Sequence, residues 1–198
     1  MRGLRFRRET GFPPAAVAPM KFTFNEDKAL AALAYVASLE QGLTPLFVAK
    51  ILFFAEKAHI NQFGRPILGD TFIAMPRGPV PSTVKNYVDE KWEWVGKPEN
   101  FDRFVRIERW GLRRLSAGPE PADETVLSES DKRCLREAVA FCHGKTANQL
   151  SDLTHFEKSW LNAPSNRPMS YEDFVDETNP HREEVLEMMR ENAAYGVL

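Results

Sequence analysis

Apolar residues dominate one stretch of the chain, Leu46 to Ala55, in which only Lys50 is charged. Apolar side chains recur there and just beyond at the 3.6-residue period of a helix, at Phe47, Ile51, Phe54, Ala55 and Ala58. Thr44 is a good N-cap, and Pro45 suits the first helical position, where no backbone donor is needed. A helix that is apolar on most of its circumference must be covered by other elements. The pattern therefore predicts a buried central helix over about 45–60.

The residues after this helix predict a turn, a short strand and a stiff loop. Gly64 can take the left-handed conformation that ends a helix, and Pro66 prevents the helix from resuming. A strand is expected over 71–74. The loop 76–81 has three prolines around one glycine, so its backbone is ordered at low entropic cost. Such a loop suits a contact surface.

The remaining pattern is mostly helical. A helix is expected over 25–39, another over 82–92, and further helices over 128–142, 146–155, 170–174 and 180–192, two of them opened by capping boxes at Ser128 and Thr146. The alternating pieces 104–107 and 109–115 could pair as a hairpin, and with 71–74 they might form a three-stranded sheet. The expected fold is α+β and mostly α-helical, with helices packed around the central helix and a small antiparallel sheet.

Length and composition limit the number of domains and the classes of protein to which the chain could belong. The 198 residues fit one domain, and the net charge of −2 gives no global basic field for nucleic acid. No apolar run approaches the ~20 residues of a membrane span. Cys134 and Cys142 lie about two turns apart in one predicted helix, too far for a disulfide. Two thiols without a disulfide framework fit a reducing compartment, here the cytoplasm. Residues 1–19, rich in arginine and proline, are expected to form a disordered tail.

Two separated motifs carry a family resemblance. The stretch ILFFAEKAHINQFGRPILGDTFIAMPRGPVPS, followed later by QLSDLTHFEKSW, resembles the Panacea domain of SocA-like antitoxins, formerly a phage-associated domain of unknown function. The matching features are Phe54-Ala55, His59, the Gly64-Arg65-Pro66 turn, Ile73-Ala74, Gly78-Pro79-Val80, the Leu150–His155 segment and Trp160. The family often has a Lys-Tyr or similar pair where this chain has Pro76-Arg77.

The resemblance implies a non-enzymatic antitoxin that holds its cognate toxin by direct protein binding. One branch of the family is also implied to deliver its toxin to the ClpXP protease through ClpX. The resemblance covers 20–165, and 166–198 are expected to form a helical extension packed on the same domain. The expected partner-binding residues are Arg77, Gly78, Pro79, Val80, His155, Glu157 and Trp160. No cofactor is expected.

Two other readings of the residues stay open, a hydrolase and a nucleic-acid binder, and a metal site is disfavoured. His155 with Glu157 could supply the general base and carboxylate of a hydrolase, although a histidine ending a short helix more often caps it. Arginines clustered over 103–114 around Trp110 could bind nucleic acid, although Asp102 and Glu108 lie among them. The histidines and cysteines lack metal-ligand spacing, so no metal site is expected.

Overall fold

The computed structural model describes residues 20–109, 111–121 and 123–198. The expected tail over 1–19 and the proposed role of Trp110 lie outside these ranges. The elements in chain order are α1 (Glu26–Leu39), α2 (Pro45–Phe63), β1 (Phe72–Met75), β2 (Gly78–Pro81), α3 (Ser82–Val88), α4 (Trp92–Val95), α5 (Phe101–Phe104), β3 (Val105–Glu108), β4 (Arg114–Ala117), η1 (Glu124–Val126), α6 (Glu129–Cys142), α7 (Ala147–His155), α8 (Lys158–Leu161), η2 (Tyr171–Phe174) and α9 (Arg182–Tyr195). The α+β, mostly helical fold class is confirmed.

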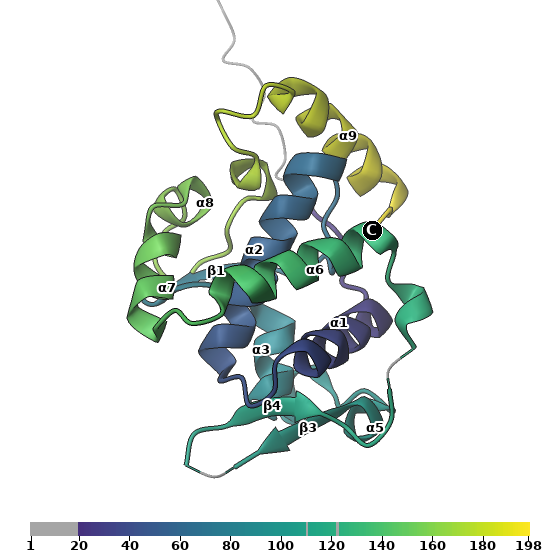
Figure 1. Cartoon of the computed structure of the whole chain (residues 1–198). Coiled ribbons are helices and arrows are strands. Elements are labelled where there is room, and N and C mark those ends of the chain that lie inside the picture. The colour runs from purple at the N-terminus through teal and green to yellow at the C-terminus, as the bar shows by residue number, and fades with distance from the viewer. Residues whose placement is uncertain (1–19, 110, 122) are drawn as a thin grey trace, which may run out of the picture.

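Helix α2 runs through the middle of the fold, and the other helices lie around it (Figure 1). The Thr44 hydroxyl accepts a hydrogen bond from the Phe47 amide at 3.5 Å, and Gly64 ends the helix in the left-handed conformation with φ 60°. Both caps were predicted from the sequence. Caps fix where a buried helix begins and ends, so α2 sets the position of the segments that follow it.

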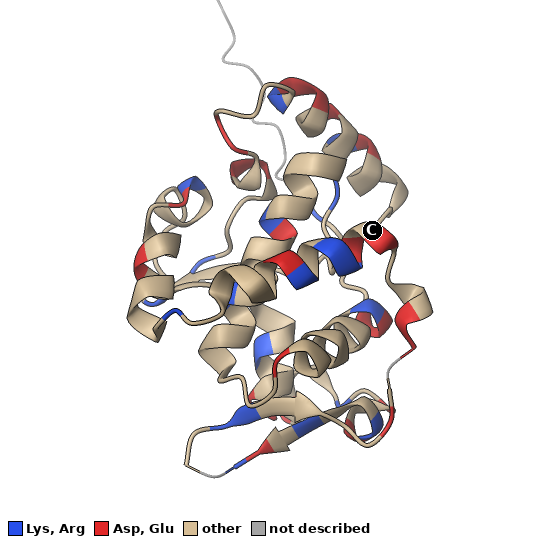
Figure 2. Ribbon diagram, in the orientation of Figure 1, with Lys and Arg blue, Asp and Glu red and all other residues tan. Residues whose placement is uncertain are grey.

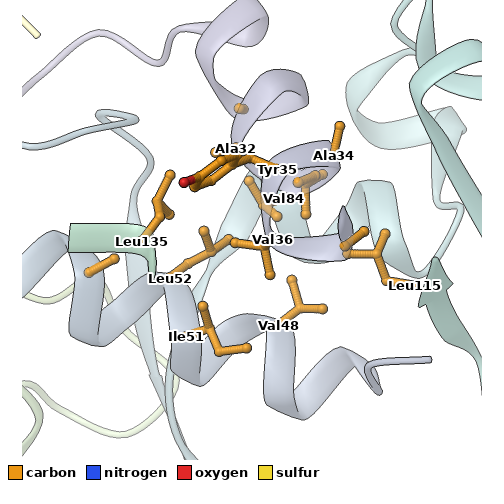
Figure 3. Packing of buried hydrophobic residues seen from close by; sticks show 14 of the residues in the cluster. Ala32, Ala34, Tyr35, Val36, Val48, Ile51, Leu52, Val84, Leu115 and Leu135 are labelled. Atoms are coloured by element: carbon orange, nitrogen blue, oxygen red, sulfur yellow. The ribbon is translucent and has the colours of Figure 1, made fainter. Parts of the chain in front are cut away.

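Two apolar clusters cover the two halves of α2. Figure 3 shows Val36, Leu52, Val84 and Leu115 pointing toward one another from α1, α2, α3 and β4. The second cluster joins Phe53 to the C-terminal segment, where Phe72 and Phe174 pack edge-on at 5.4 Å between ring centroids. Residues after 165 thus pack directly on α2, with α9 beside its C-terminal end (Figure 1).

The predicted three-stranded sheet is wrong. The strands form two separate antiparallel pairs, β1 with β2 and β3 with β4. The other edge of β1 is occupied by the chain around 166–169, which exchanges backbone hydrogen bonds with Phe72 and Ala74. That edge is therefore not open to β3, and the β3–β4 hairpin instead meets the start of α2 through the bridge between Leu43 and Leu115.

Element boundaries also differ from the prediction. The second strand of the hairpin, expected over 109–115, is Arg114–Ala117. The loop expected over 76–81 is mostly strand, because β2 spans Gly78–Pro81 and pairs Val80 with Ile73. Its prolines are tolerated because β2 is an edge strand, where a missing N–H breaks few ladder bonds. The helix expected over 82–92 ends at Val88, and Glu90 adopts a left-handed φ of 56° before the separate turn α4.

Candidate partner-binding site

Buried carboxylates hold the backbone of the motif in place, and the first of them lies on α2. The buried Glu56 carboxylate accepts the amides of Ile67 at 2.6 Å and Leu68 at 2.8 Å. Burial raises the pKa of Glu56 to about 7, although those two amides favour its ionised form. Asp70 similarly accepts the amides of Thr83 and Val84 at the start of α3. These carboxylates fix the backbone of 64–84 and do not face a ligand.

A buried ionic cluster joins the motif to α1 and α6. The Asp131 carboxylate lies 3.0 Å from Lys28 Nζ, 3.0 Å from His59 Nε2 and 3.4 Å from an Arg65 guanidinium nitrogen. Burial disfavours the Asp131 carboxylate, but hydrogen bonds from His59, the Ser128 amide and Lys28 outweigh it and hold its pKa well below the usual range. His59 and Arg65 of the motif are therefore structural.

The β1–β2 turn presents Arg77 to solvent on a backbone held from below. Lys50 Nζ, on α2, donates to the Arg77 carbonyl at 2.6 Å and to Thr154 Oγ1 at 2.7 Å. Gly78 has φ +99°, and a Cβ added there would overlap both Lys50 Nζ and Thr154 Oγ1. The prolines restrict the backbone of the turn, but contacts with α2 and α7 fix its position.

Helices α7 and α8 bring the second predicted segment against this turn. Trp160 Nε1 donates to the Met75 carbonyl at 3.0 Å, at the end of β1. His155 stacks on Trp160 with ring centroids 4.2 Å apart. The structure therefore brings together the two segments that the sequence singled out, 77–80 and 155–160. Within the first, Arg77 is exposed, Gly78 and Pro79 are buried, and Val80 is half-buried.

The predicted pairing of His155 with Glu157 for hydrolysis is not assembled. Glu157 binds Lys57 Nζ at 2.6 Å, and the same ammonium binds Asp176 at 2.8 Å. The His155 ring instead stacks on Trp160. Glu157 is therefore engaged in anchoring α8 to α2, and a general base next to a free carboxylate is not found at this place.

Sequence reasoning missed two exposed apolar side chains beside this segment. Phe156 is 81% exposed and Leu161 is 61% exposed. They flank the His155–Trp160 stack in sequence, and Leu153 is also exposed. Large apolar groups that gather at a surface commonly mark a contact site. Leu153 lies three residues after the buried Leu150, a spacing that puts both on one side of a helix, so helix periodicity did not predict its exposure.

The arginines over 103–114 are largely ion-paired. Arg103 binds Glu120 at 2.6 Å, and Arg109 binds Glu90 at 2.5 Å. Arg113 lies 3.6 Å from the same Glu90, and Arg114 donates to the Gly42 carbonyl at 2.9 Å. Figure 2 shows both signs of charge along this hairpin. The pairing favours an ion-paired protein surface over a phosphate-binding one.

Two cavities open beside the turn. One, of about 380 Å³, is lined by Leu46, Lys50, Met75, Arg77, Lys85 and Asp89 among others. The other, of about 730 Å³, lies toward the hairpin and is lined by residues that include Leu46, Phe47, Arg77, Arg109, Leu112 and Arg113. We call them the Lys50 cavity and the hairpin groove. Both volumes fall in the range of protein ligand pockets.

Metal sites and membrane-spanning helices are two further classes to consider in the described ranges. No group of three or more His, Cys, Asp or Glu there could hold a metal ion. Cys134 and Cys142 are buried free thiols. No helix in these ranges is long and apolar enough to span a membrane.

Comparison with known proteins gives one family. No curated protein and no solved structure matches the chain. The sequence pattern of the family described as "antitoxin SocA-like, Panacea domain" matches residues 48–161. This range is more than half of the chain, and it contains α2 from Val48 onward, the β1–β2 turn and the α7–α8 segment. The chain therefore belongs to the SocA-like antitoxin, Panacea domain family.

Proposed function

We propose that the chain is an antitoxin that neutralises a cognate toxin by binding it directly, without catalysis. Membership of the SocA-like antitoxin family supports the antitoxin role. The geometry adds a surface suited to a protein partner, in which the β1–β2 turn that carries the exposed Arg77 contacts Trp160, Trp160 stacks on His155, and the exposed Phe156 follows His155 in the chain. Arginine and aromatic side chains on a fixed backbone are typical binding anchors, and binding would block the working surface of the toxin.

The observation that carries this proposal is the fixed β1–β2 turn. Lys50 and Trp160 hold its backbone by donating hydrogen bonds to the carbonyls of Arg77 at 2.6 Å and Met75 at 3.0 Å. The Thr154 hydroxyl accepts a second hydrogen bond from the same Lys50 ammonium at 2.7 Å. A surface that is ordered before binding loses little conformational entropy when a partner arrives. The predicted residues of this surface are Arg77, Gly78, Pro79, Val80, His155, Glu157 and Trp160, of which the buried ones act by positioning the others.

Co-expression with the product of the adjacent open reading frame tests the proposal. We expect growth to be rescued and the two proteins to purify together. Arg77→Glu and Phe156→Ser should each weaken the complex about tenfold or more, because they remove exposed anchors. Arg190→Glu is the matched control, because Arg190 belongs to α9, a helix that contributes none of the predicted partner-binding residues and lies at the other end of the fold from the β3–β4 hairpin (Figure 1). An adjacent product that is harmless, or that never co-purifies, would refute the assignment.

The family resemblance extends the proposal to delivery of the toxin to ClpXP in the cytoplasm. The same co-expression system measures it through the half-life of the toxin. We expect the antitoxin to shorten that half-life in cells with ClpX and to leave it unchanged in cells without ClpX. Equal half-lives in both strains would remove the adaptor role and leave neutralisation by binding in place. We also propose that 20–165 form the family domain and 166–198 an extension of it.

A further inference from the structure

The Lys50 cavity and the hairpin groove adjoin each other. Both are lined by Pro45, Leu46 and Arg77, so the first turn of α2 and the β1–β2 turn form their shared wall. Apolar side chains line both hollows, with Met75 in the first and Phe47 in the second. Leu112, at the tip of the hairpin, is 68% exposed. Their volumes of about 730 and 380 Å³ each fall in the range of protein ligand pockets, so together they can accept several side chains of a peptide segment.

Positive charge predominates along these two hollows. Their lining contains one carboxylate, Asp89, and five basic residues, which are Lys50, Arg77, Lys85, Arg109 and Arg113. Asp89 is already ion-paired with Lys85, and Glu90 beside the groove is paired with Arg109 and Arg113. Two cations of the lining, Lys50 and Arg77, form no ion pair with a carboxylate in the described ranges. The chain as a whole has a net charge of −2, so this surface differs in sign from its average.

Among the basic residues of the lining, Lys50 indicates most clearly what kind of group the hollows would bind. Its residue is 1% exposed, yet both acceptors of its ammonium, the Arg77 carbonyl and the Thr154 hydroxyl, are neutral. An ammonium has three N–H donors, and a buried charge is ordinarily paired. The elements around it bring Arg77 from the turn, Cys142 from α6, and Lys85 with Asp89 from α3. A carboxylate entering the Lys50 cavity would provide the missing counter-charge.

We propose that these hollows bind a segment of the partner protein that carries both acidic and apolar side chains, with one carboxylate reaching the Lys50–Arg77 wall. The inference rests on the proposed function and adds the chemistry of the partner. Apolar side chains of the segment pack on Leu46 and Leu112, while a carboxylate pairs with Arg77 at the surface and Lys50 behind it. Charge complementarity of this kind gives specificity and a faster encounter.

Charge argues against one other occupant, and the apolar lining argues against a second. Residues 1–19 contain Arg2, Arg5, Arg7 and Arg8 with a single acid, Glu9, so this segment has the wrong sign to fill the hollows. Nucleic acid has the right sign, but the Leu46, Met75 and Leu112 lining favours apolar side chains over phosphate. An acidic protein segment satisfies both features of the lining.

Selection from a random dodecapeptide library displayed on phage, against the full chain, tests the proposal without knowledge of the toxin. We expect enriched peptides with Asp or Glu next to Leu, Ile or Phe. The best peptide is then labelled with fluorescein, and its Kd is measured by anisotropy. Arg77→Glu and Lys50→Met should weaken binding about tenfold, Leu112→Ser about fivefold, and Arg190→Glu less than twofold. A peptide with Gln in place of each acid should bind about tenfold more weakly.

Several outcomes would overturn the proposal. The selection would do so if it enriched no peptide, or only peptides without acidic residues. The binding assay would do so if the Arg77→Glu and Leu112→Ser variants bound the peptide as tightly as the wild type, or if a single-stranded oligonucleotide displaced the peptide. Leu112 is exposed, so its variant tests the site even if Lys50→Met fails to fold. A toxin that co-purifies but is insensitive to both surface variants would refute this site and retain the antitoxin function. Acidic peptides that bind a chain with no toxin partner would do the reverse.

Discussion

The buried ammonium of Lys50 should make the stability of the chain depend on pH. Burial, with a smaller contribution from Arg77, lowers the pKa of Lys50 from 10.5 to about 7. Below pH 7 the amine is charged in both the folded and the unfolded chain, and the folded chain bears the full cost of burying that charge. Between pH 7 and 10.5 the unfolded chain keeps a proton that the folded chain has released. The free energy of unfolding therefore rises with pH across this window.

The magnitude follows from the same two pKa values. Integrating the difference in bound protons between pH 7 and pH 9 gives about 2 kcal/mol, because each full proton contributes about 1.4 kcal/mol per pH unit. Lys50→Met has no titrating amine at this place. The stability of the wild type should therefore increase relative to that of Lys50→Met by about 2 kcal/mol over this range, whatever the offset between the two proteins at pH 7.

Urea unfolding at several pH values, followed by tryptophan fluorescence, measures this difference. Arg190→Met is the control, since arginine does not titrate in proteins and its curve should run parallel to that of the wild type. If the wild type and Lys50→Met also run parallel from pH 7 to pH 9, Lys50 is not held in a site that disfavours its charge. An incoming carboxylate would then have no unpaired buried charge at Lys50 to neutralise.

Three further predictions concern the same architecture. Gly78→Ala should lower the free energy of unfolding by about 2–4 kcal/mol, because its Cβ would overlap Lys50 and Thr154; Gly144→Ala, also at positive φ but with no atom within 4 Å of the added Cβ, should lose only about 1 kcal/mol in the same thermal scan. Asp131→Asn should cost about 3–5 kcal/mol by leaving Lys28 and Arg65 without their carboxylate, whereas Glu129→Gln, at an exposed carboxylate of the same helix, should leave the stability nearly unchanged. Because the pKa of Asp131 is lowered, its contribution is present above pH 3.8 and is lost as pH falls further. The difference in stability between wild type and Asp131→Asn should therefore close in acid, and a constant difference would contradict the assignment. In a mobility-shift assay at about 50 mM salt the purified chain should not retard DNA, and retardation that is abolished by Arg106→Glu with Arg113→Glu would instead support the nucleic-acid reading.

Local patterns predicted the elements that depend on neighbouring residues. The apolar run, Thr44 and Gly64 were enough to predict α2, because helix periodicity and caps act within a few residues of the chain. The capping boxes at Ser128 and Thr146 are both present as predicted. The same local reasoning predicted a hairpin from 104–107 and 109–115, and the strands formed are Val105–Glu108 and Arg114–Ala117. The family resemblance, rather than local pattern alone, singled out the segments 77–80 and 155–160, which the structure brings together through Trp160 and Met75.

Tertiary structure decided everything that joins distant residues. Periodicity cannot show that 166–169 occupy the edge of β1, or that Glu157 is engaged by Lys57 rather than by His155. It also cannot show which tryptophan is exposed, and Trp94 is 76% exposed whereas Trp160 is half-buried.

The charged residues of α2 show the physical reason most clearly. In sequence, Lys50 and Glu56 are interruptions of an apolar helix, and nothing nearby in the chain explains them. In the fold, Lys50 meets Thr154 and Glu56 meets the amides of Ile67 and Leu68. A buried charge is tolerated only where its partners converge on it in space. The sequence therefore determined which helix would be buried, and only the packing of the whole chain determined what its charges hold.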